Sequence, residues 1–176
     1  MNLTLHLTAD CNLRCRYCYE THCKNYMTLS TARQAVDLVF SYGHKTNGFS
    51  LFGGEPLLER VLAEEICRYA KAQAQQRGVS VRFKMTTNGT LLDEAFLRFA
   101  NEHDLEIALS HDGLLQDEQR LTRDGRPTRE KLEEVVDLLL KHQPGAVALQ
   151  TVTPETVGGM AESVCYLYER GFSRIN

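Results

Sequence analysis

Short apolar runs alternate with longer amphipathic patterns along the whole chain, and this alternation limits the possible folds more than any other feature. Runs of four to nine apolar and β-branched residues predict strands, whereas apolar residues at helical spacing predict helices. Strands that alternate with helices predict βαβ units and a parallel sheet. The predicted strands are residues 2–8, 48–52, 79–87, 105–110 and 146–152. The predicted helices are residues 28–42, 56–77, 93–101, 129–142 and 156–170.

Five such units fit either an α/β doubly wound sheet or part of a (β/α) barrel, and periodicity alone does not choose between them. Residues 172–176 have the character of a sixth strand that is just beginning. A chain of 176 residues is long enough for one domain with a sizeable core. We therefore expect residues 1–176 to form a single core domain, and to be a fragment of a longer chain.

The charge pattern excludes several classes of partner. The chain has 20 basic and 23 acidic residues, a net charge of −3, and no polybasic block. Nucleic-acid binders usually carry a basic excess, so we expect no nucleic-acid partner. No apolar run approaches the length of a membrane span, and the N-terminus has no secretory signal pattern. We therefore expect a cytoplasmic protein with no membrane partner, in a compartment where disulfides are rare.

Three of the six cysteines lie within eight residues, directly after the first predicted strand. Cys11, Cys15 and Cys18 have the spacing C-x3-C-x2-C, in the kind of loop where parallel α/β folds place their sites. Three thiolates can hold three corners of a [4Fe–4S] cluster and leave one iron open, because such a cluster usually takes four. The alternative is a zinc site completed by His22, although zinc sites usually pair two C-x2-C units.

Further motifs follow the next strands. Cys11–Glu20, with Tyr17 before the third cysteine, and Gly53–Pro56, which reads GGEP, together resemble the signature of the radical S-adenosylmethionine (radical SAM) superfamily. Ser110–Gly113 resembles the S-x-D-G segment of that superfamily. Residues 116–120 resemble its H-D-x-x-R segment, with glutamine in place of histidine and a shorter spacing. The resemblance covers nearly the whole chain.

The resemblance implies a partial (β/α)6 TIM-like barrel, truncated at the start of the sixth strand. It implies a [4Fe–4S] cluster and S-adenosylmethionine as cofactors, with the latter bound to the open iron. Reductive cleavage would give methionine and a 5′-deoxyadenosyl radical that abstracts hydrogen from a substrate. The implied metal ligands are Cys11, Cys15 and Cys18. The implied cofactor-binding residues are Tyr17, Gly53, Gly54, Glu55, Pro56, Asn88, Ser110, Asp112 and Arg120.

Each implied contact has a physical rationale and a plainer alternative. Glycines at 53 and 54 would let the backbone approach a ligand closely, and the resemblance places Glu55 against the methionine ammonium. Tyr17 would stack on the adenine. Ser110 would bind the ribose hydroxyls and Arg120 the carboxylate. Taken alone, GGEP is an ordinary strand–turn–helix joint, and the other three residues could be a loop aromatic, a turn cap and a solvated arginine.

The combination of motifs resembles the subfamily that modifies peptides and proteins, the SPASM-type maturases that form thioethers or oxidise sulfatase residues. We therefore expect a peptide or protein substrate, although the cysteine-rich segment that such enzymes usually add is absent from the 176 residues. The resemblance also implies a one-electron donor such as flavodoxin or ferredoxin. The alternatives are a small-molecule substrate and, from another class, a structural module with zinc at the three cysteines.

Alternation along the strands gives a last set of expectations. Leu3, Leu5 and Leu7 share one strand face, so the opposite faces predict a polar interior that forms an open substrate cavity. The predicted interior residues are His6, Lys84, Asn88, Glu106 and Gln150. An ion pair between Lys84 and Glu106 would explain those two residues equally well. Outside the cluster, we expect Cys67 and Cys165 to be small core residues and Cys23 to be a free thiol.

Overall fold

Six parallel strands form the main sheet of the computed structural model, which describes residues 1–176. Their order across the sheet is β1-β3-β4-β5-β7-β8. The register runs without a break through most pairs, and a shift between β1 and β3 follows His6. The strands are β1 (Asn2–Thr8), β3 (Thr46–Gly53), β4 (Ser80–Thr87), β5 (Leu105–Ser110), β7 (Val147–Leu149) and β8 (Arg174–Ile175).

The strand order decides between the two folds that the alternation allows. Each strand of the main sheet lies beside the one before it, and the order never reverses. A doubly wound sheet would reverse its order at a switch point, whereas a (β/α) barrel adds each strand on the same side. The sheet ends at β1 and β8, which do not pair with each other. The predicted partial (β/α)6 barrel is therefore confirmed.

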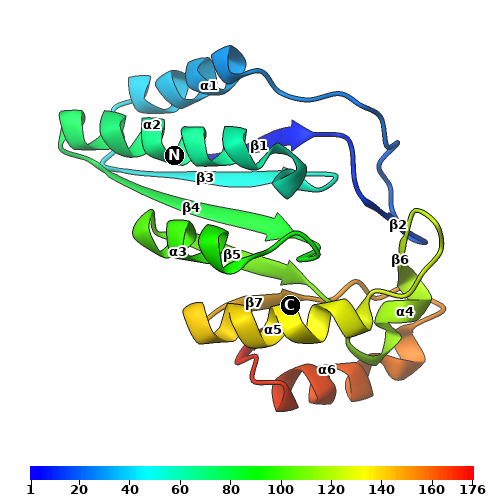
Figure 1. Ribbon diagram of the computed structural model, residues 1–176. Helices are drawn as coiled ribbons and strands as arrows, with labels where there is room; N and C mark the ends of the chain where they lie inside the picture. Colours follow the sequence, from blue (N-terminus) through cyan, green and yellow to red (C-terminus); the bar gives the residue numbers. More distant parts are fainter.

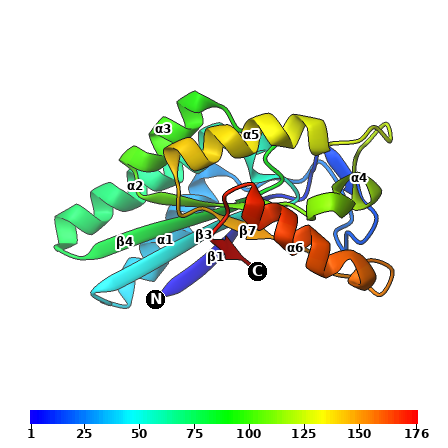
Figure 2. The ribbon, with the colours of Figure 1, turned by 90° about the horizontal axis from the view of Figure 1, so that it is seen from below.

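Along the chain, helices connect successive strands of the main sheet. In space, α2, α3 and α5 run side by side along one face of the sheet (Figure 1, Figure 2). The Thr28 side chain caps α1 by accepting from Thr31 N, and Asp93 caps α3 in the same way through Phe96 N. The predicted helix at residues 56–77 begins with a 3-10 turn, η1 (Pro56–Glu59). The helices are α1 (Leu29–Ser41), α2 (Arg60–Arg77), α3 (Glu94–Glu102), α4 (Gln116–Gln119), α5 (Arg129–His142) and α6 (Met160–Glu169), with further 3-10 turns η2 (Gly113–Leu115) and η3 (Val157–Gly159).

The core lies between the helices and one face of the sheet. Leu5 and Leu7 in β1, and Phe83 and Met85 in β4, are buried in one cluster with apolar residues of the helices. The opposite face is polar and open, since His6 is exposed and Lys84, Glu106 and Gln150 are half-buried. The predicted polar face is confirmed for these four residues, and Asn88 is buried and lines a cavity. That this face forms a substrate cavity stays a prediction.

The alternative of an ion pair between Lys84 and Glu106 is not found. The two residues are register partners in β4 and β5, but the Glu106 carboxylate pairs with Arg174 of β8 instead. Cys67 is fully buried in α2 and Cys23 is an exposed free thiol, as expected. Cys165 is not a core residue: it is exposed on α6, where Ser163 and Leu167 take the buried positions.

Two features of the strands differ from the sequence prediction. The fifth main strand is assigned only as far as Leu149. Gln150 N still donates to the Asn176 carbonyl beside β8, whereas Thr151 N turns away and donates to Asp112 Oδ1. A small antiparallel pair, β2 (Leu13–Cys15) with β6 (Arg120–Thr122), was not predicted. No helix is both long enough and apolar enough to cross a membrane.

Candidate functional site

The three clustered cysteines line one cavity of about 330 Å³, which is in the size range of small-molecule sites. The arrowheads of the main strands point toward the end of the molecule where β2 and β6 lie side by side (Figure 1). The cavity is at this end, as expected for a parallel α/β fold. Besides the cysteines, the wall includes Tyr17, Phe52, Gly53, Gly54, Thr86, Thr87, Asn88, Ser110, Arg120, Leu149 and Thr151.

The cysteine loop is tied to the end of β3 by backbone hydrogen bonds. Gly54 N donates to the Thr8 carbonyl at 2.9 Å, and Glu55 N donates to the Asp10 carbonyl at 2.8 Å. A Cβ atom at Gly54 would lie 2.3 Å from the Asp10 carbonyl oxygen, and one at Gly53, where φ is +140°, would lie 2.3 Å from that of Thr8. These glycines therefore let the end of β3 come close to the backbone of residues 8–10, rather than to a ligand alone.

Cys11 is the most enclosed of the three thiols. Leu13 N donates to its Sγ at 3.4 Å, and Asn88 Nδ2 lies 3.8 Å from the same atom. Asn88 is held in turn by Asn12, whose Oδ1 accepts from Asn88 Nδ2 at 2.9 Å. Burial raises the pKa of Cys11 to about 11 and also raises that of Cys15. Cluster binding must therefore displace protons from these two thiols.

Glu55 lies behind the cavity wall. Its carboxylate is fully buried, and its Oε1 accepts from Leu57 N and the Thr87 hydroxyl, while its Oε2 accepts from Asn88 N at 2.8 Å. Burial raises its pKa above the usual value for a glutamate. Pro56 is buried as well. In this arrangement Glu55 orients Asn88, and its predicted contact with S-adenosylmethionine stays a prediction.

Tyr17 and Arg120 form a second wall of the cavity. The Arg120 guanidinium lies 5.2 Å from the centre of the Tyr17 ring, in a cation–π arrangement. The Tyr17 hydroxyl donates to Asp112 Oδ2 at 2.6 Å, and the Arg120 Nε donates to the same oxygen at 2.9 Å. Burial raises the pKa of Tyr17, so it stays protonated at neutral pH. Asp112 does not line the cavity, whereas Ser110, at the end of β5, does.

The donor set fits a cluster better than a single ion. Cys18 is exposed, and its Sγ lies 3.4 Å from Nε2 of His22, the ligand of the alternative zinc site. However, no three His, Cys, Asp or Glu side chains converge as they would around one metal ion. A cuboidal cluster binds each thiolate at a different iron, so its ligands need not converge. All six cysteines are free, and three of them share the cavity wall.

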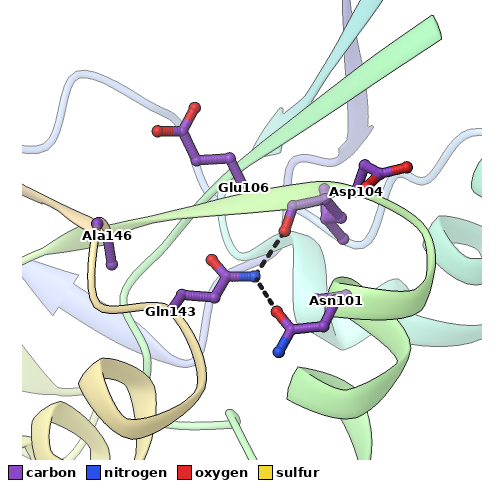
Figure 3. A pocket seen from close by; sticks show the side chains of 8 residues that line it. Asn101, Asp104, Glu106, Gln143 and Ala146 are labelled. Atoms are coloured by element: carbon purple, nitrogen blue, oxygen red, sulfur yellow. Dashed lines mark hydrogen bonds between the residues drawn. The ribbon is translucent and has the colours of Figure 1, made fainter.

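A second depression, at the amino ends of β5 and β7, has a different character. It has a volume of about 400 Å³ and is lined by Asn101, Gln143 and neighbouring residues. Figure 3 shows the Gln143 amide between the ends of α3 and β5, where its Nε2 donates to Asn101 Oδ1 and the Leu105 carbonyl. Its Oε1 accepts from Ile107 N. The polar groups of Asn101 and Gln143 are used in joining elements. Glu106, a predicted interior residue, also lines this depression and pairs with Arg174.

The sequence profile of the Radical SAM superfamily matches residues 5–164 of the chain. The chain therefore belongs to the radical SAM superfamily, a class whose partial barrel and three-cysteine loop are those described above.

Among curated proteins, the chain is 30% identical to an uncharacterized protein of Methanocaldococcus jannaschii, over 99% of this chain and 61% of that protein. It is 31% identical to the serine-type anaerobic sulfatase-maturating enzyme of Klebsiella aerogenes, over 91% of this chain and 40% of that enzyme. It is 26% identical to the cysteine-type enzyme of Clostridium perfringens, over 94% of this chain and 47% of that enzyme. The chain thus spans about 40–61% of the length of these relatives.

Solved structures agree with this placement. Native anSMEcpe with bound AdoMet and a peptide superposes with a TM-score of 0.89 at 25% identity, covering 99% of this chain and 49% of that one. SuiB of Streptococcus suis, bound to its precursor peptide SuiA, superposes with a TM-score of 0.67 at 14% identity over 99% of this chain and 38% of that one, and supports the fold alone.

The structure brings most of the predicted site residues to one cavity. All three cysteines and Tyr17, Gly53, Gly54, Asn88, Ser110 and Arg120 line it. Glu55, Pro56 and Asp112 do not, and they support the wall from behind. The sequence patterns assigned no role to Asn12, Thr87 or Thr151, whose polar atoms bind Asn88, Glu55 and Asp112. Thr87 ends β4 and Thr151 follows β7, positions that the sequence indicates, but their hydrogen-bond partners depend on the fold.

Proposed function

We propose that this chain uses Cys11, Cys15 and Cys18 to hold a [4Fe–4S] cluster and binds S-adenosylmethionine beside it. The observation that carries the proposal is the single cavity lined by three free thiols, Tyr17, Ser110 and Arg120, at the carboxyl ends of the strands. Bound together, the two cofactors supply reductive cleavage to a 5′-deoxyadenosyl radical for hydrogen abstraction from a substrate.

The chain's own residues would orient the cofactors and shape the cavity. Tyr17 offers an aromatic face for the adenine. Arg120 offers its guanidinium for the carboxylate, and Ser110 its hydroxyl for the ribose. Asn88 is placed to donate to the Cys11 sulfur, and hydrogen bonds to sulfur tune the potential of an iron–sulfur cluster.

A peptide or protein is the proposed substrate. The curated relatives include serine-type and cysteine-type sulfatase-maturating enzymes, and anSMEcpe holds a peptide together with AdoMet. The open polar face of the sheet, with His6 and Lys84, gives room for a chain-like substrate beside the cavity. An external one-electron donor, such as flavodoxin or ferredoxin, would complete the reaction.

Deuterium transfer tests this proposal. Peptides that carry deuterium on the side-chain carbon of serine or cysteine are incubated anaerobically with the reconstituted chain, S-adenosylmethionine and dithionite. We expect 5′-deoxyadenosine that contains deuterium, measured by mass spectrometry. Cleavage of S-adenosylmethionine without deuterium transfer from any peptide would favour the small-molecule alternative, and a lack of cleavage would contradict the proposed chemistry.

A further inference from the structure

The Asp112 carboxylate is saturated with hydrogen bonds inside the protein. Its Oδ2 accepts from the Tyr17 hydroxyl at 2.6 Å and from Arg120 Nε at 2.9 Å. Its Oδ1 accepts from Thr151 N at 2.9 Å and from Arg120 Nη2 at 3.3 Å. A carboxylate offers about four lone-pair positions, so four donors fill them. Asp112 is only 1% exposed, which leaves no free acceptor for a bound cofactor.

The donors to Asp112 come from three separate parts of the chain. Tyr17 belongs to the cysteine loop, Arg120 begins β6, and Thr151 follows β7, while Asp112 itself follows β5. Arg120 is also the register partner of Cys15 in the β2–β6 pair. One buried carboxylate therefore connects the second cluster cysteine and its neighbouring tyrosine to two strand ends.

A ring of buried hydrogen bonds braces this connection from behind. Asp112 N donates to Gln116 Oε1, and Gln116 Nε2 donates to Thr128 Oγ1, both at 2.9 Å. The Thr128 hydroxyl donates to the Arg120 carbonyl at 2.6 Å, which closes the ring back to the partner of Asp112. Gln116 stands where the family segment has histidine, and both ends of its amide are used in the ring.

Cys11 is held by a different set of residues. Its sulfur is approached by Leu13 N and Asn88, and Asn88 is fixed by Asn12 and the Glu55 carboxylate. This set shares no hydrogen bond with the Asp112 network. The cysteine loop thus has two side-chain supports, one for Cys11 and one for Cys15 with Tyr17. They share the backbone of β2, where Leu13 and Cys15 both pair with β6.

We propose that Asp112 is a positioning residue that holds Tyr17 directly and Cys15 through Arg120, without contacting the cofactor. This inference rests on the proposed function only in taking Cys15 as a cluster ligand. Buried charges depend on their partners, because removal of one leaves the other unpaired in a low-dielectric site. Loss of the Asp112 charge should therefore release the Cys15 side of the loop and leave the Cys11 side in place.

Alkylation of individual cysteines tests the proposal. The whole chain is treated with iodoacetamide before iron is added, and the rate at each cysteine is measured by peptide mass spectrometry. The pH dependence of each rate is measured, so that the rate per thiolate can be compared between variants. In Asp112→Asn, the rate per thiolate at Cys15 should rise about tenfold or more, as expected when a charged hydrogen bond is lost, while that at Cys11 stays unchanged. Asp137→Asn is the control. Asp137 pairs with Arg170 at 2.7 Å, and this ion pair is on α5 and α6 rather than on the cysteine loop. In this variant the alkylation rates at Cys11 and Cys15 should both stay unchanged.

Tyr17→Phe keeps the proposal testable if the Asp112 variant fails to fold, as judged by circular dichroism. This change removes one donor to Asp112 and keeps the ring beneath Arg120, so a smaller rise at Cys15 alone is expected. Equal rises at Cys11 and Cys15, or no rise in a folded variant, would overturn the positioning role. If the variants show the predicted alkylation rates but the wild-type chain binds no iron after reconstitution, the positioning role stands and the proposed function is refuted.

Discussion

The three thiols that share the cavity differ in how far they are buried. Cys11 is buried, Cys15 is half-buried and Cys18 is exposed. The first two thiols have raised pKa values because burial disfavours the thiolate. The exposed thiol is the one that a metal or an oxidant reaches first, and the enclosed ones require a ligand strong enough to displace their protons.

Replacement of any one of these cysteines by alanine should abolish cluster binding. A [4Fe–4S] cluster usually has four cysteine ligands, and the proposed site has only three, so the loss of one leaves too few. Iron and sulfide are measured after anaerobic reconstitution of Cys11→Ala, Cys15→Ala and Cys18→Ala. Cys67→Ala is the control, since Cys67 is a buried core residue of α2. Equal iron content in all four variants would contradict the ligand assignment.

His111 makes the stability of the fold depend on pH. It is 1% exposed, its Nδ1 accepts from Gly113 N at 3.0 Å, and burial lowers its pKa to about 4. The unfolded chain binds a proton at this residue near pH 6.5, whereas the folded chain does not until about pH 4. Stability from this residue is therefore complete above pH 6.5 and is lost as the pH falls toward 4.

The variant His111→Asn keeps an acceptor but cannot be protonated in this range. Chemical denaturation at several pH values should show a loss between pH 6.5 and 4 that is up to roughly 3 kcal/mol smaller in the variant than in the wild type. Other groups titrate in both proteins, so the difference between the two curves is the measured quantity. Parallel curves would mean that His111 is not buried in its neutral form.

At the level of elements, the joint between β3 and η1 fixes the cysteine loop. Gly54→Ala would place a methyl group 2.3 Å from the Asp10 carbonyl, so the loop must shift or the strand end must move. We expect a loss of about 1–3 kcal/mol in the free energy of unfolding, typical of overpacking, and weaker iron binding. Denaturant titration and iron analysis measure the two effects.

Gly145→Ala is the control for this prediction. Gly145 has open space around its Cβ position and precedes β7 at the opposite end of the sheet. Its replacement should change the free energy of unfolding by no more than about 0.5 kcal/mol and leave iron binding intact. If both glycine variants behave alike, the contact with Asp10 is not what requires a glycine at position 54.

The elements that could be predicted from the sequence are those with a strong periodic pattern. The main strands and the five long helices follow from apolar spacing and caps, as at Thr28 and Asp93. The pair of β2 and β6 could not be predicted, because three-residue strands carry no periodic signal and pair across more than 100 residues. Cys165 was misplaced because an amphipathic pattern does not say which flank of α6 meets the core.

The same distinction applies to the site. The cysteine spacing and the GGEP segment are local signals, and all three cysteines lie at one cavity as predicted. The bonds from Glu55 to Asn88 and from Asp112 to Tyr17 span 33 and 95 residues. Partners so far apart in the sequence meet only in the folded chain. The sequence therefore singled out Glu55 and Asp112 as site residues, but it did not show that they bind Asn88 and Tyr17.

At the scale of the whole molecule, the open parallel sheet brings distant residues together at one cavity and leaves its inner face accessible. The carboxyl ends of the strands bring residues from distant parts of the chain to one cavity, as the wall formed by Cys15, Asn88 and Ser110 illustrates. The unclosed edges between β1 and β8 leave the polar inner face accessible. The cavity that we propose as the cofactor site thus lies beside a larger open surface.

Electron spin resonance of the anaerobically reconstituted and reduced chain tests the central claim most directly. The account predicts about four iron atoms per chain and a signal that changes when S-adenosylmethionine is added, because one iron lacks a protein ligand. One zinc or iron ion per chain, or a cluster signal that S-adenosylmethionine leaves unchanged, would contradict it.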